Sequence, residues 1–490
     1  MERDFHNTPP VLFSPPGYEG ESDCACAGEI LLVTPPVQPF DSDCACAAGA
    51  SIDNMPLPKT TRWVLPTLLH RAPLPGGYQV AFNPAGPANV VVLNTSAMSL
   101  LESYVTPAPL DSALAQQMAA LGLLTPFGET AFAPPSSRVL TIWLHITARC
   151  NFRCLYCYAP KSDSDMSPEV GRAALEAAFR STQIHGFGGL KIKYAGGEPA
   201  LNLPTVRIIH AYAKKLAANA GLELQEILLS NGTLLTSETL GWLRDEGIRL
   251  SISLDGIGDM RNRQRPSARR EGSFSLVIKS IEQALALGLS PHLSVTVTAY
   301  NVKHLAEVAA FALEHGLTFN LNFVRPASGM LNLMPTPEQL VAGVQAVLAE
   351  IERQLPPYRL IDGLLDRCGL NAPHRYPCGA GHSYLVVNPG GGVSRCHMQM
   401  GKEICTVWEE DPLGVIRRAE TGFRNLPVDE KEICRDCLWR YVCAGGCPLL
   451  TCRLTGRDDV PSPYCDAYRV LLPELIRLEG LRILKMQTGV

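Results

Sequence analysis

The sequence lacks three features that would define common classes of protein. It has no apolar run that approaches the ~20 residues of a membrane-spanning helix. Its first residues lack the basic start and apolar core of a secretory signal. It also lacks an excess of one charge, because 43 Lys and Arg residues face 47 Asp and Glu residues, which argues against a broad surface for nucleic acid or anionic membrane. We therefore predict a cytoplasmic protein with neither partner.

Cysteine, in contrast, is abundant, with 17 in 490 residues. The composition is 46% hydrophobic and 18% charged, which predicts sizeable buried cores in about three domains. Disulfides are rare in a reducing compartment, so a disulfide framework is not expected. The cysteines cluster at short spacings, and clustered cysteines in a cytosolic protein indicate metal ligands.

Residues 1–58 form a predicted N-terminal tail with an internal repeat. Their richness in Pro, Gly and Ser favours a flexible, extended chain. Pro15-Pro16 and a later Ser-Asp-Cys-Ala-Cys-Ala segment recur twenty residues on, so that the repeated boxes contain Cys24, Cys26, Cys44 and Cys46. Three interpretations remain open: a peptide substrate in cis or a mimic of one, a labile metal site, or a tail without chemistry.

Residues 59–135 have the pattern of a small separate domain. Two short strands, at 80–83 and 90–93, precede helices that begin at residue 96 and span 110–124. Two strands followed by helices in ~75 residues suit a winged-helix module. We expect the central part of this segment, residues 66–127, to fold by itself.

From residue 138 to about 325, apolar strands alternate with amphipathic helices, within a predicted domain that spans 136–340. The expected strands are 139–146, 190–194, 226–230, 249–254, 292–297 and 318–324. The expected helices are 169–182, 204–220, 236–246, 274–287 and 303–315. This alternation predicts an α/β fold, a partial (β/α)6 barrel with right-handed crossovers. A linker with a helix (341–377) and a cysteine-rich domain (378–490) with a final helix near 473–486 complete the chain.

Three cysteines, Cys150, Cys154 and Cys157, follow the first barrel strand with the spacing C-x3-C-x2-C. Barrel enzymes hold their chemistry at this C-terminal end of the strands. Three thiolates can wrap one corner of a cubane iron–sulfur cluster, which normally takes four cysteines. The missing fourth ligand leaves one iron position open for a substrate or cofactor. Zinc binding and ordinary core thiols are the alternatives.

Glycines and small polar residues end other barrel strands at the same rim. Two adjacent glycines let the backbone approach a ligand closely, and a carboxylate beside them can accept hydrogen bonds from an ammonium group. The residues concerned are Gly196, Gly197, Glu198, Ser230, Asn231, Ser253 and Asp255.

These motifs resemble those of the radical S-adenosylmethionine (SAM) superfamily, over roughly residues 138–325. The family motif C-x3-C-x-aromatic-C is met by Cys150, Cys154, Tyr156 and Cys157, and the Gly-Gly-Glu motif by residues 196–198. The resemblance implies a 4Fe-4S cluster whose open iron chelates SAM. It also implies that an electron from the cluster cleaves SAM to a 5′-deoxyadenosyl radical.

The resemblance further implies which residues contact the cofactor. Tyr156 is expected near the adenine, and residues 196–198 at the methionine amino group. Ser253 and Arg265 match positions that contact the cofactor in peptide-modifying members. Such members carry His-Asp before the arginine, where this chain has Arg261-Asn262. Ser230, Asn231 and Asp255 complete the expected set of cofactor-binding residues.

The C-terminal cysteines follow a second, more specific pattern. They read Cys378-x12-Gly391-x4-Cys396, then Cys434-x2-Cys437-x5-Cys443-x3-Cys447, then Cys465. This spacing resembles the seven-cysteine SPASM extension of peptide-modifying radical enzymes. A pair of interleaved zinc sites is the alternative, since zinc accepts the same thiolates.

The SPASM resemblance implies two auxiliary 4Fe-4S clusters that conduct electrons or coordinate the substrate. One would be held by Cys378, Cys396 and Cys447, and the other by Cys434, Cys437, Cys443 and Cys465. Cys368 is expected as the fourth ligand of the first cluster, with Cys405 as the second choice. Cys452 is expected to be an ordinary thiol.

One candidate catalytic residue follows from a departure from this family. Sulfatase-maturating relatives carry an Asp, used as a base, immediately after the position of Cys396, where this chain has His397. A histidine titrates near neutrality. An exposed histidine with a structural role is the alternative, and the change weakens a sulfatase-maturation hypothesis.

Residues 66–127 resemble the winged-helix domains that recognise the leader peptides of precursors. Such domains take the leader as an extra strand on an exposed sheet edge, where backbone hydrogen bonds supply affinity. The alternative is a structural cap on the barrel.

The sequence therefore predicts a radical SAM oxidoreductase that modifies a ribosomally made peptide or small protein, forming a thioether or carbon–carbon cross-link. Its expected partners are the precursor peptide and an electron donor such as flavodoxin or ferredoxin. One alternative is oxidation of a single residue, as in sulfatase maturation. Another is a non-enzymatic iron–sulfur or zinc peptide-binding protein, but a pure carrier has no need of a vacant iron position beside Gly196-Gly197-Glu198.

Overall fold

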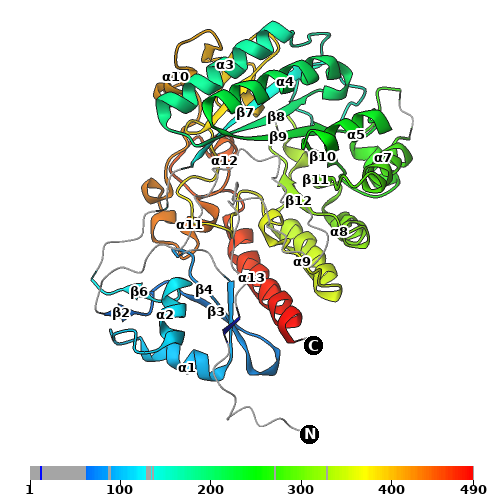
Figure 1. The fold of residues 1–490 in the computed structure, drawn as a ribbon. Coiled ribbons are helices and arrows are strands. Elements are labelled where there is room, and N and C mark those ends of the chain that lie inside the picture. The colour runs from blue at the N-terminus through cyan, green and yellow to red at the C-terminus, as the bar shows by residue number, and fades with distance from the viewer. Residues whose placement is uncertain are drawn as a thin grey trace.

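The computed structural model describes residues 12–13, 62–86, 90–128, 134, 137–269, 272–326 and 329–488. The Asp-Cys-Ala-Cys boxes lie outside these residues, so the hypotheses about them stay predictions. Figure 1 shows the barrel sheet and its helices at one end of the molecule and a small N-terminal module at the other, with the C-terminal helix between them.

Six parallel strands form the centre of the larger part, in the order β12-β11-β10-β9-β8-β7. They are β7 (Val139–Thr147), β8 (Gly189–Gly196), β9 (Glu223–Ser230), β10 (Arg249–Ser253), β11 (His292–Val297) and β12 (Phe319–Phe323). Each strand pairs in parallel with its neighbour in the chain. The predicted partial (β/α)6 barrel is therefore confirmed, because every crossover between these strands returns to the adjacent position in the sheet.

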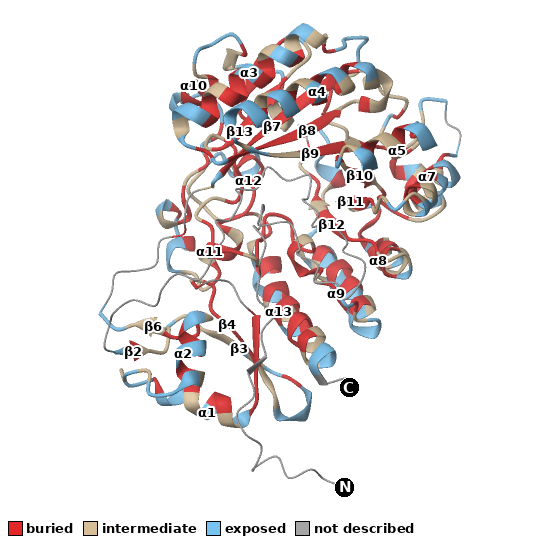
Figure 2. Cartoon of the chain, viewed as in Figure 1, coloured by how far each residue is buried: buried red, intermediate tan, exposed pale blue. Residues whose placement is uncertain are grey.

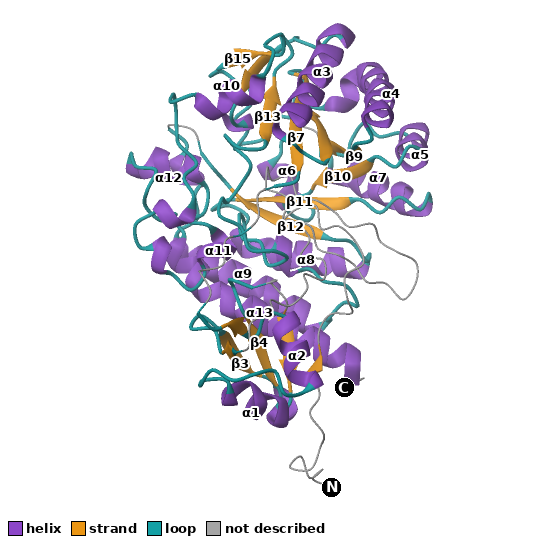
Figure 3. Ribbon diagram, turned by 60° about the vertical axis from the view of Figure 1, so that its left-hand side comes forward, coloured by secondary structure: helices purple, strands orange, loops and turns teal. Residues whose placement is uncertain are grey.

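Helices cover the outer face of this sheet, as Figure 3 shows. They are α3 (Pro168–His185), α4 (Leu203–Ala220), α5 (Ser237–Asp245), α7 (Phe274–Ala286) and α8 (Leu305–Glu314). The short helix α6 (Asp259–Gln264) follows β10, and α9 (Pro337–Arg353) packs against α8. Local signals fix their ends: the Ser167 side chain caps the first turn of α3, and Gly186 ends it with a φ of 70°. The five expected barrel helices all form, whereas the short helix α6 was not expected.

The cysteine-rich region extends the barrel sheet, which the sequence did not predict. Strand β13 (Tyr384–Val387) pairs in parallel with β7, and β14 (Gly392–Ser394) and β15 (Cys405–Thr406) continue the sheet in antiparallel fashion. The short helices α10 (Pro412–Arg418), α11 (Arg440–Cys443) and α12 (Pro448–Thr455) follow. Because β13 lies directly beside β7, the second group of cysteines is tied to the barrel by backbone hydrogen bonds.

The N-terminal module contains a four-stranded antiparallel sheet in the order β1-β5-β4-β3. Its strands are β1 (Leu12–Phe13), β3 (His70–Pro73), β4 (Gln79–Phe82) and β5 (Val90–Leu93). Two helices, α1 (Thr95–Ser103) and α2 (Ala113–Ala120), and the pair β2 (Trp63–Val64) and β6 (Thr125–Pro126) complete it. Helix α2 is shorter than the expected 110–124, because the Ser112 side chain caps its start and Gly122 follows its end with a φ of 74°.

The strands β4 and β5 of the module's sheet are buried on both faces, which changes the expectation that the module folds by itself. Val91 and Leu93 pack into the module's own core with α1 and α2. Val90 and Val92 belong instead to the main core of the protein, and β5 contacts the long C-terminal helix α13 (Cys465–Thr488). Figure 2 shows this buried strand beside the buried side of α13. The module therefore depends on α13 to bury one face of its sheet.

Helix α13 begins earlier than the sequence predicts. Pro473 suits the first turn of a helix, where a missing N–H costs nothing, so a start at 473 was expected. In the structure Pro473 lies inside the helix, which begins at Cys465. The extra two turns carry Tyr468, Leu471 and Leu472, which are all buried. Tertiary packing thus offsets the cost of an internal proline.

Candidate functional site

The loop with the first three cysteines leaves β7 at its C-terminal end and is held against the loop after α6. The backbone N–H of Leu155 donates to the Gln264 carbonyl at 3.1 Å, and that of Arg153 donates to the Pro266 carbonyl at 2.8 Å. Cys150, Cys154 and Cys157 are half-buried on this loop. Burial raises the pKa of the Cys150 and Cys154 thiols. The structure thus brings these three sulfurs to the rim of the barrel, where the sequence placed them.

Two glycines at the end of β8 make room for this loop. A Cβ on Gly196 would lie 2.4 Å from the Thr147 carbonyl oxygen, and the φ of Gly196 is 142°. A Cβ on Gly197 would lie 2.0 Å from the Arg149 carbonyl oxygen and 3.0 Å from the Cys150 Cβ. Only glycine allows this close approach, so the two residues join the end of β8 to the cysteine loop.

Glu198, the next residue, is fully buried and is held by hydrogen bonds from the end of β9. The Ser230 hydroxyl donates to Oε1 at 2.9 Å, and the Asn231 backbone N–H donates to Oε2 at 2.7 Å. Burial raises the pKa of Glu198, and these hydrogen bonds oppose the shift. Two of the predicted site residues, Ser230 and Asn231, therefore converge on the carboxylate of a third.

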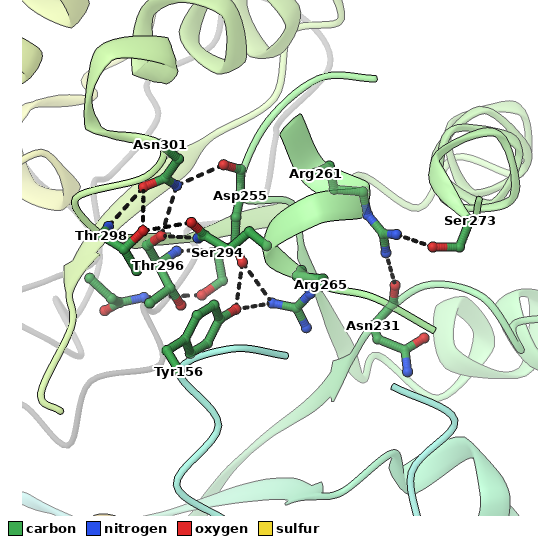
Figure 4. Close-up of polar contacts among 12 residues, drawn as sticks. Tyr156, Asn231, Asp255, Arg261, Arg265, Ser273, Ser294, Thr296, Thr298 and Asn301 are labelled. Atoms are coloured by element: carbon green, nitrogen blue, oxygen red, sulfur yellow. Dashed lines mark hydrogen bonds and ion pairs between the residues drawn. The ribbon is translucent and has the colours of Figure 1, made fainter. Parts of the chain in front are cut away.

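Tyr156, Asp255 and Arg265 form a second polar group at the rim, shown in Figure 4. The Tyr156 hydroxyl donates to Asp255 Oδ2 at 2.5 Å, and Arg265 donates both to that hydroxyl and, at 3.2 Å, to the same carboxylate oxygen. The backbone N–H of Thr296 donates to Asp255 Oδ1 at 2.8 Å. Asp255 is fully buried, so the Arg265 charge compensates it. The cysteine loop is thereby joined to β10, α6 and β11.

Arg261 is a buried residue that sequence reasoning did not assign to the site. Its guanidinium donates to the Ser273 hydroxyl and to the Asn231 carbonyl oxygen, and it lies 5.1 Å from the centre of the Phe152 ring. Burial lowers the pKa of Arg261 to about 10. The signal was present as the departure Arg261-Asn262 from the family pattern. Among the described residues, the buried Nε atoms of Arg261 and Arg265 have no hydrogen-bond partner.

The second group of cysteines divides between two cavities, in the two sets that the sequence predicted. One cavity is lined by Cys434, Cys437, Cys443 and Cys465. The other is lined by Cys378, Cys396 and Cys447, together with Arg325, Arg367 and His397. Burial raises the pKa of Cys443 and of Cys396 to about 12 in these cavities.

Cys447 differs from its neighbours because two guanidinium groups face it. Burial by itself raises the pKa of its thiol, but Arg325 and Arg367 outweigh that effect and bring it below the ordinary value. Arg325 Nε donates to the Cys447 sulfur at 3.0 Å. Arg325 follows β12, so the last barrel strand contributes directly to the three-cysteine cavity.

The remaining cysteines of the C-terminal region line neither cavity. Cys368, expected as a fourth ligand, is 2% exposed and packs in the main core. Cys405, the second choice, lies in β15 with its sulfur 3.8 Å from the Pro412 carbonyl oxygen. Cys452 lies in α12, as befits an ordinary thiol. In the part of the chain that the structure describes, no three His, Cys, Asp or Glu side chains are placed to hold a single metal ion.

His397 lies between the three-cysteine cavity and the inner face of β7. Its ring stacks on Trp143 at 4.6 Å between centroids, and its Nδ1 lies 3.1 Å from the Tyr384 hydroxyl. Burial, and then the neighbouring Arg367 and Arg325, lower the pKa of His397 well below its usual value. His397 is therefore not exposed, unlike the exposed structural histidine that the sequence analysis gave as the alternative.

Comparisons with known proteins agree with this geometry. Residues 144–312 match the family model of the Radical SAM superfamily. A PqqA peptide cyclase from Xanthomonas axonopodis is 25% identical over 69% of this chain and 89% of its own length. A GTP 3′,8-cyclase from Saccharophagus degradans is 32% identical over 37% of this chain, which spans 52% of that relative's length.

The solved structures agree at the level of the fold. The structure of native anSMEcpe with bound AdoMet and Cp18Cys peptide superposes with a TM-score of 0.57 at 20% identity, covering 72% of this chain and 99% of that one. The fold and the three-cysteine loop thus define an iron–sulfur barrel protein. Residues 144–312 thus form a domain that matches the radical SAM superfamily. Among the described residues, no helix is long and apolar enough to cross a membrane.

Proposed function

We propose that this protein is a radical SAM enzyme that modifies a ribosomally made peptide or small protein, by forming a thioether or carbon–carbon cross-link. The observation that carries the proposal is the convergence of three sulfurs, Glu198 and the group of Tyr156, Asp255 and Arg265 on one barrel rim, beside two further cysteine-lined cavities. A simple peptide carrier has no use for this combination.

The residues present fit a 4Fe-4S cluster and SAM at the rim. Cys150, Cys154 and Cys157 would hold the cluster, because cubane clusters take cysteine thiolates. The buried, unpartnered Nε of Arg265 suits an anionic group such as the SAM carboxylate, and Glu198 suits the amino group. When bound, the cluster and SAM supply one-electron chemistry that removes a hydrogen atom from an unactivated carbon.

The chain's own residues would orient these groups and keep water away. Arg265 and Asp255 fix the Tyr156 hydroxyl, and Tyr156 thereby presents its ring at the rim in one orientation. Arg261 donates a hydrogen bond to the Asn231 carbonyl oxygen, and the Asn231 backbone N–H donates one to Glu198. The site is therefore organised before any ligand binds, which is how buried dipoles contribute most to catalysis.

The two C-terminal cavities would hold the auxiliary clusters. Four cysteines suit a fully ligated cluster, and three leave one position for another ligand. Cys368 does not line the three-cysteine cavity. The permanently charged side chains that do line this cavity are those of Arg325 and Arg367. An electron donor such as flavodoxin or ferredoxin would supply the reducing electron in the cytosol.

A peptide substrate suits both the inner face of the barrel and the N-terminal module. His145 and Trp143 on β7 are buried and each has an unpartnered ring nitrogen among the described residues, so polar groups of a substrate can meet them. The module offers a sheet edge of the kind that binds extended peptides. The name of the PqqA peptide cyclase relative also supports a peptide.

The test uses anaerobically reconstituted protein with dithionite, SAM and a peptide encoded beside the gene. We expect 5′-deoxyadenosine to form, and fragment masses of the peptide to contain two residues joined covalently. Replacing Cys150, Cys154 and Cys157 together with Ala should abolish 5′-deoxyadenosine while the protein retains auxiliary iron. Cys452→Ala, which removes a thiol that lines neither cavity, is the matched control and should keep full turnover.

Three outcomes would contradict the proposal or a part of it. Formation of 5′-deoxyadenosine by the triple variant would show that another site performs the cleavage. A peptide oxidised at one residue, with no joined fragments, would favour the sulfatase-type alternative over cross-linking. Stoichiometric zinc in place of the C-terminal iron would favour the zinc alternative for the two auxiliary cavities.

A further inference from the structure

The N-terminal sheet already has an extra strand, and that strand comes from the tail of the same chain. Strand β1 pairs antiparallel with β5, with Leu12 opposite Leu93 and Phe13 opposite Val92. The other side of β5 is occupied by β4, so β1 covers the outer edge of the sheet.

The edge of β5 has little to offer a partner except its backbone. All four residues, Val90–Leu93, are fully buried, since α1 and α2 cover one face and α13 covers the other. An uncovered edge of this kind presents unpaired N–H and C=O groups and pairs readily with another extended chain. Backbone pairing is sequence-tolerant, so different short apolar segments can take the same place.

The tail contains a second segment with the same pattern as β1. Leu12-Phe13 is followed by Ser14-Pro15-Pro16, and Leu32-Val33 is followed by Thr34-Pro35-Pro36, at an offset of twenty. In both copies ten residues lie between the second strand residue and the first cysteine, from 14 to 23 and from 34 to 43. The repeat therefore joins an apolar strand segment, a Pro-Pro pair and a Cys-Ala-Cys box twice over.

We propose that the N-terminal tail is a tandem ligand for the edge of β5, which it occupies in cis and from which it excludes peptides in trans. Either copy of the strand segment can take the place of β1. A tethered segment binds intramolecularly, so a free peptide must exceed its effective concentration to displace it. The inference rests on the proposed function for the identity of the excluded peptide, but not for the pairing itself.

The test measures binding of a fluorescent synthetic peptide with the sequence of residues 9–28 to the full chain. Proline has no N–H and breaks strand pairing, so Leu12→Pro/Phe13→Pro disables the first copy and Leu32→Pro/Val33→Pro disables the second. We expect the variant with all four prolines to bind the peptide at least about tenfold more tightly than the native chain, because the edge is then free. Variants with one disabled copy should bind the peptide almost as weakly as the native chain.

The matched control places prolines elsewhere in the same repeat. Gly17→Pro/Val37→Pro changes the residue after each Pro-Pro pair and should leave peptide binding unchanged. Hydrogen exchange supplies a second readout: the β5 amides that face β1, rather than those that face β4, should exchange faster in the four-proline variant and regain protection when the peptide is added.

The inference is overturned if the four-proline variant binds the peptide no more tightly than the native chain. It is also overturned if exchange in β5 is unchanged by the prolines and slows only when a peptide is added in trans, because the edge would then be free in the native chain. These results are independent of catalysis. Failure of the proposed function would instead show as absent 5′-deoxyadenosine in every variant, with the binding results unaffected.

Discussion

The barrel rim and the N-terminal module are built on opposite principles. At the rim, charged and polar side chains are buried and hold one another, as Arg265 holds Tyr156 and Asp255. In the module, the sheet is apolar on both faces, and its functional edge consists of backbone groups. The residues of the rim come largely from the barrel strands and their loops. The sheet of the module, in contrast, is covered on one face by the C-terminal helix α13.

The difference fits the ligands proposed for each region, a cofactor at the rim and an extended peptide at the edge of the module's sheet. A cofactor of fixed structure rewards side chains that are fixed in advance, because polar groups oriented before binding need no reorganisation. A peptide in extended form is recognised through hydrogen bonds that any sequence can make, and side-chain pockets then set the choice. Buried charge therefore suits the site proposed for a ligand of fixed structure, and an edge of backbone groups suits the site proposed for a peptide of variable sequence.

The largest effect should come from Arg265→Met at the rim. The change leaves the buried Asp255 carboxylate without its cation, a loss of about 3–5 kcal/mol for a buried pair. We expect 5′-deoxyadenosine formation to fall by at least about 100-fold, which corresponds to nearly 3 kcal/mol of barrier. The exposed Arg263, two residues earlier on α6, supplies the control, and Arg263→Met should retain turnover. Comparable losses in both variants would contradict the role assigned to Arg265.

Phe82→Ala tests whether the module depends on α13. Phe82 is fully buried in the main core, so its truncation should cost about 3–5 kcal/mol. Hydrogen exchange in α13 should rise, because the helix loses an apolar surface to pack on. Met118→Ala makes a similar cavity within the module's own core and should leave exchange in α13 unchanged. Equal exchange in α13 for the two variants would mean that the module is an independent unit.

Gly480→Val tests the same contact from the side of the helix. A Cβ at Gly480 would lie 3.0 Å from the Val80 Cβ, so a larger side chain must push α13 away from β4. We expect a loss of about 1–3 kcal/mol in unfolding free energy, as for other overpacked cores. Gly241→Val in α5 is the control, since no atom lies within 4 Å of that Cβ. Chemical denaturation of the two variants gives the comparison, and equal stabilities would exclude close packing at Gly480.

The smallest effect concerns a charged group on the helical side of the barrel, away from the rim. Burial would lower the pKa of His210, but hydrogen bonds to Glu226 at 2.8 Å and Glu246 at 3.0 Å raise it above the ordinary value. A raised pKa in the folded state stabilises the protein fully below the unfolded value of about 6.5 and loses that contribution as pH rises through the folded value. Denaturation from pH 5.5 to 8.5 should therefore show a decline that His210→Gln removes. An identical pH dependence in both proteins would contradict this.

The barrel was predictable because its elements carry local signals. Strands such as β8 and helices such as α3 have the right period, caps and lengths, and they form within a few residues of their expected ends. The cysteine loop and the Gly-Gly-Glu segment were found for the same reason, since spacing along the chain brings them to the rim. Arg325 acts from a distance, carries no local signal and was missed, whereas Arg261 was noted only as a departure from the family pattern and was not assigned to the site.

The sequence by itself determined the class of chemistry, through the spacing of its cysteines and through β/α alternation that brings every strand end to one rim. Only the tertiary structure decided how the barrel, the cysteine-rich region and the N-terminal module pack against one another. Strand β13 adds the cysteine-rich region to the barrel sheet, α13 completes the N-terminal module, and Leu12-Phe13 covers the edge of β5. These are contacts between segments far apart in the chain. They depend on which apolar faces remain uncovered after each unit forms, and this is a property of surfaces in three dimensions rather than of any local pattern.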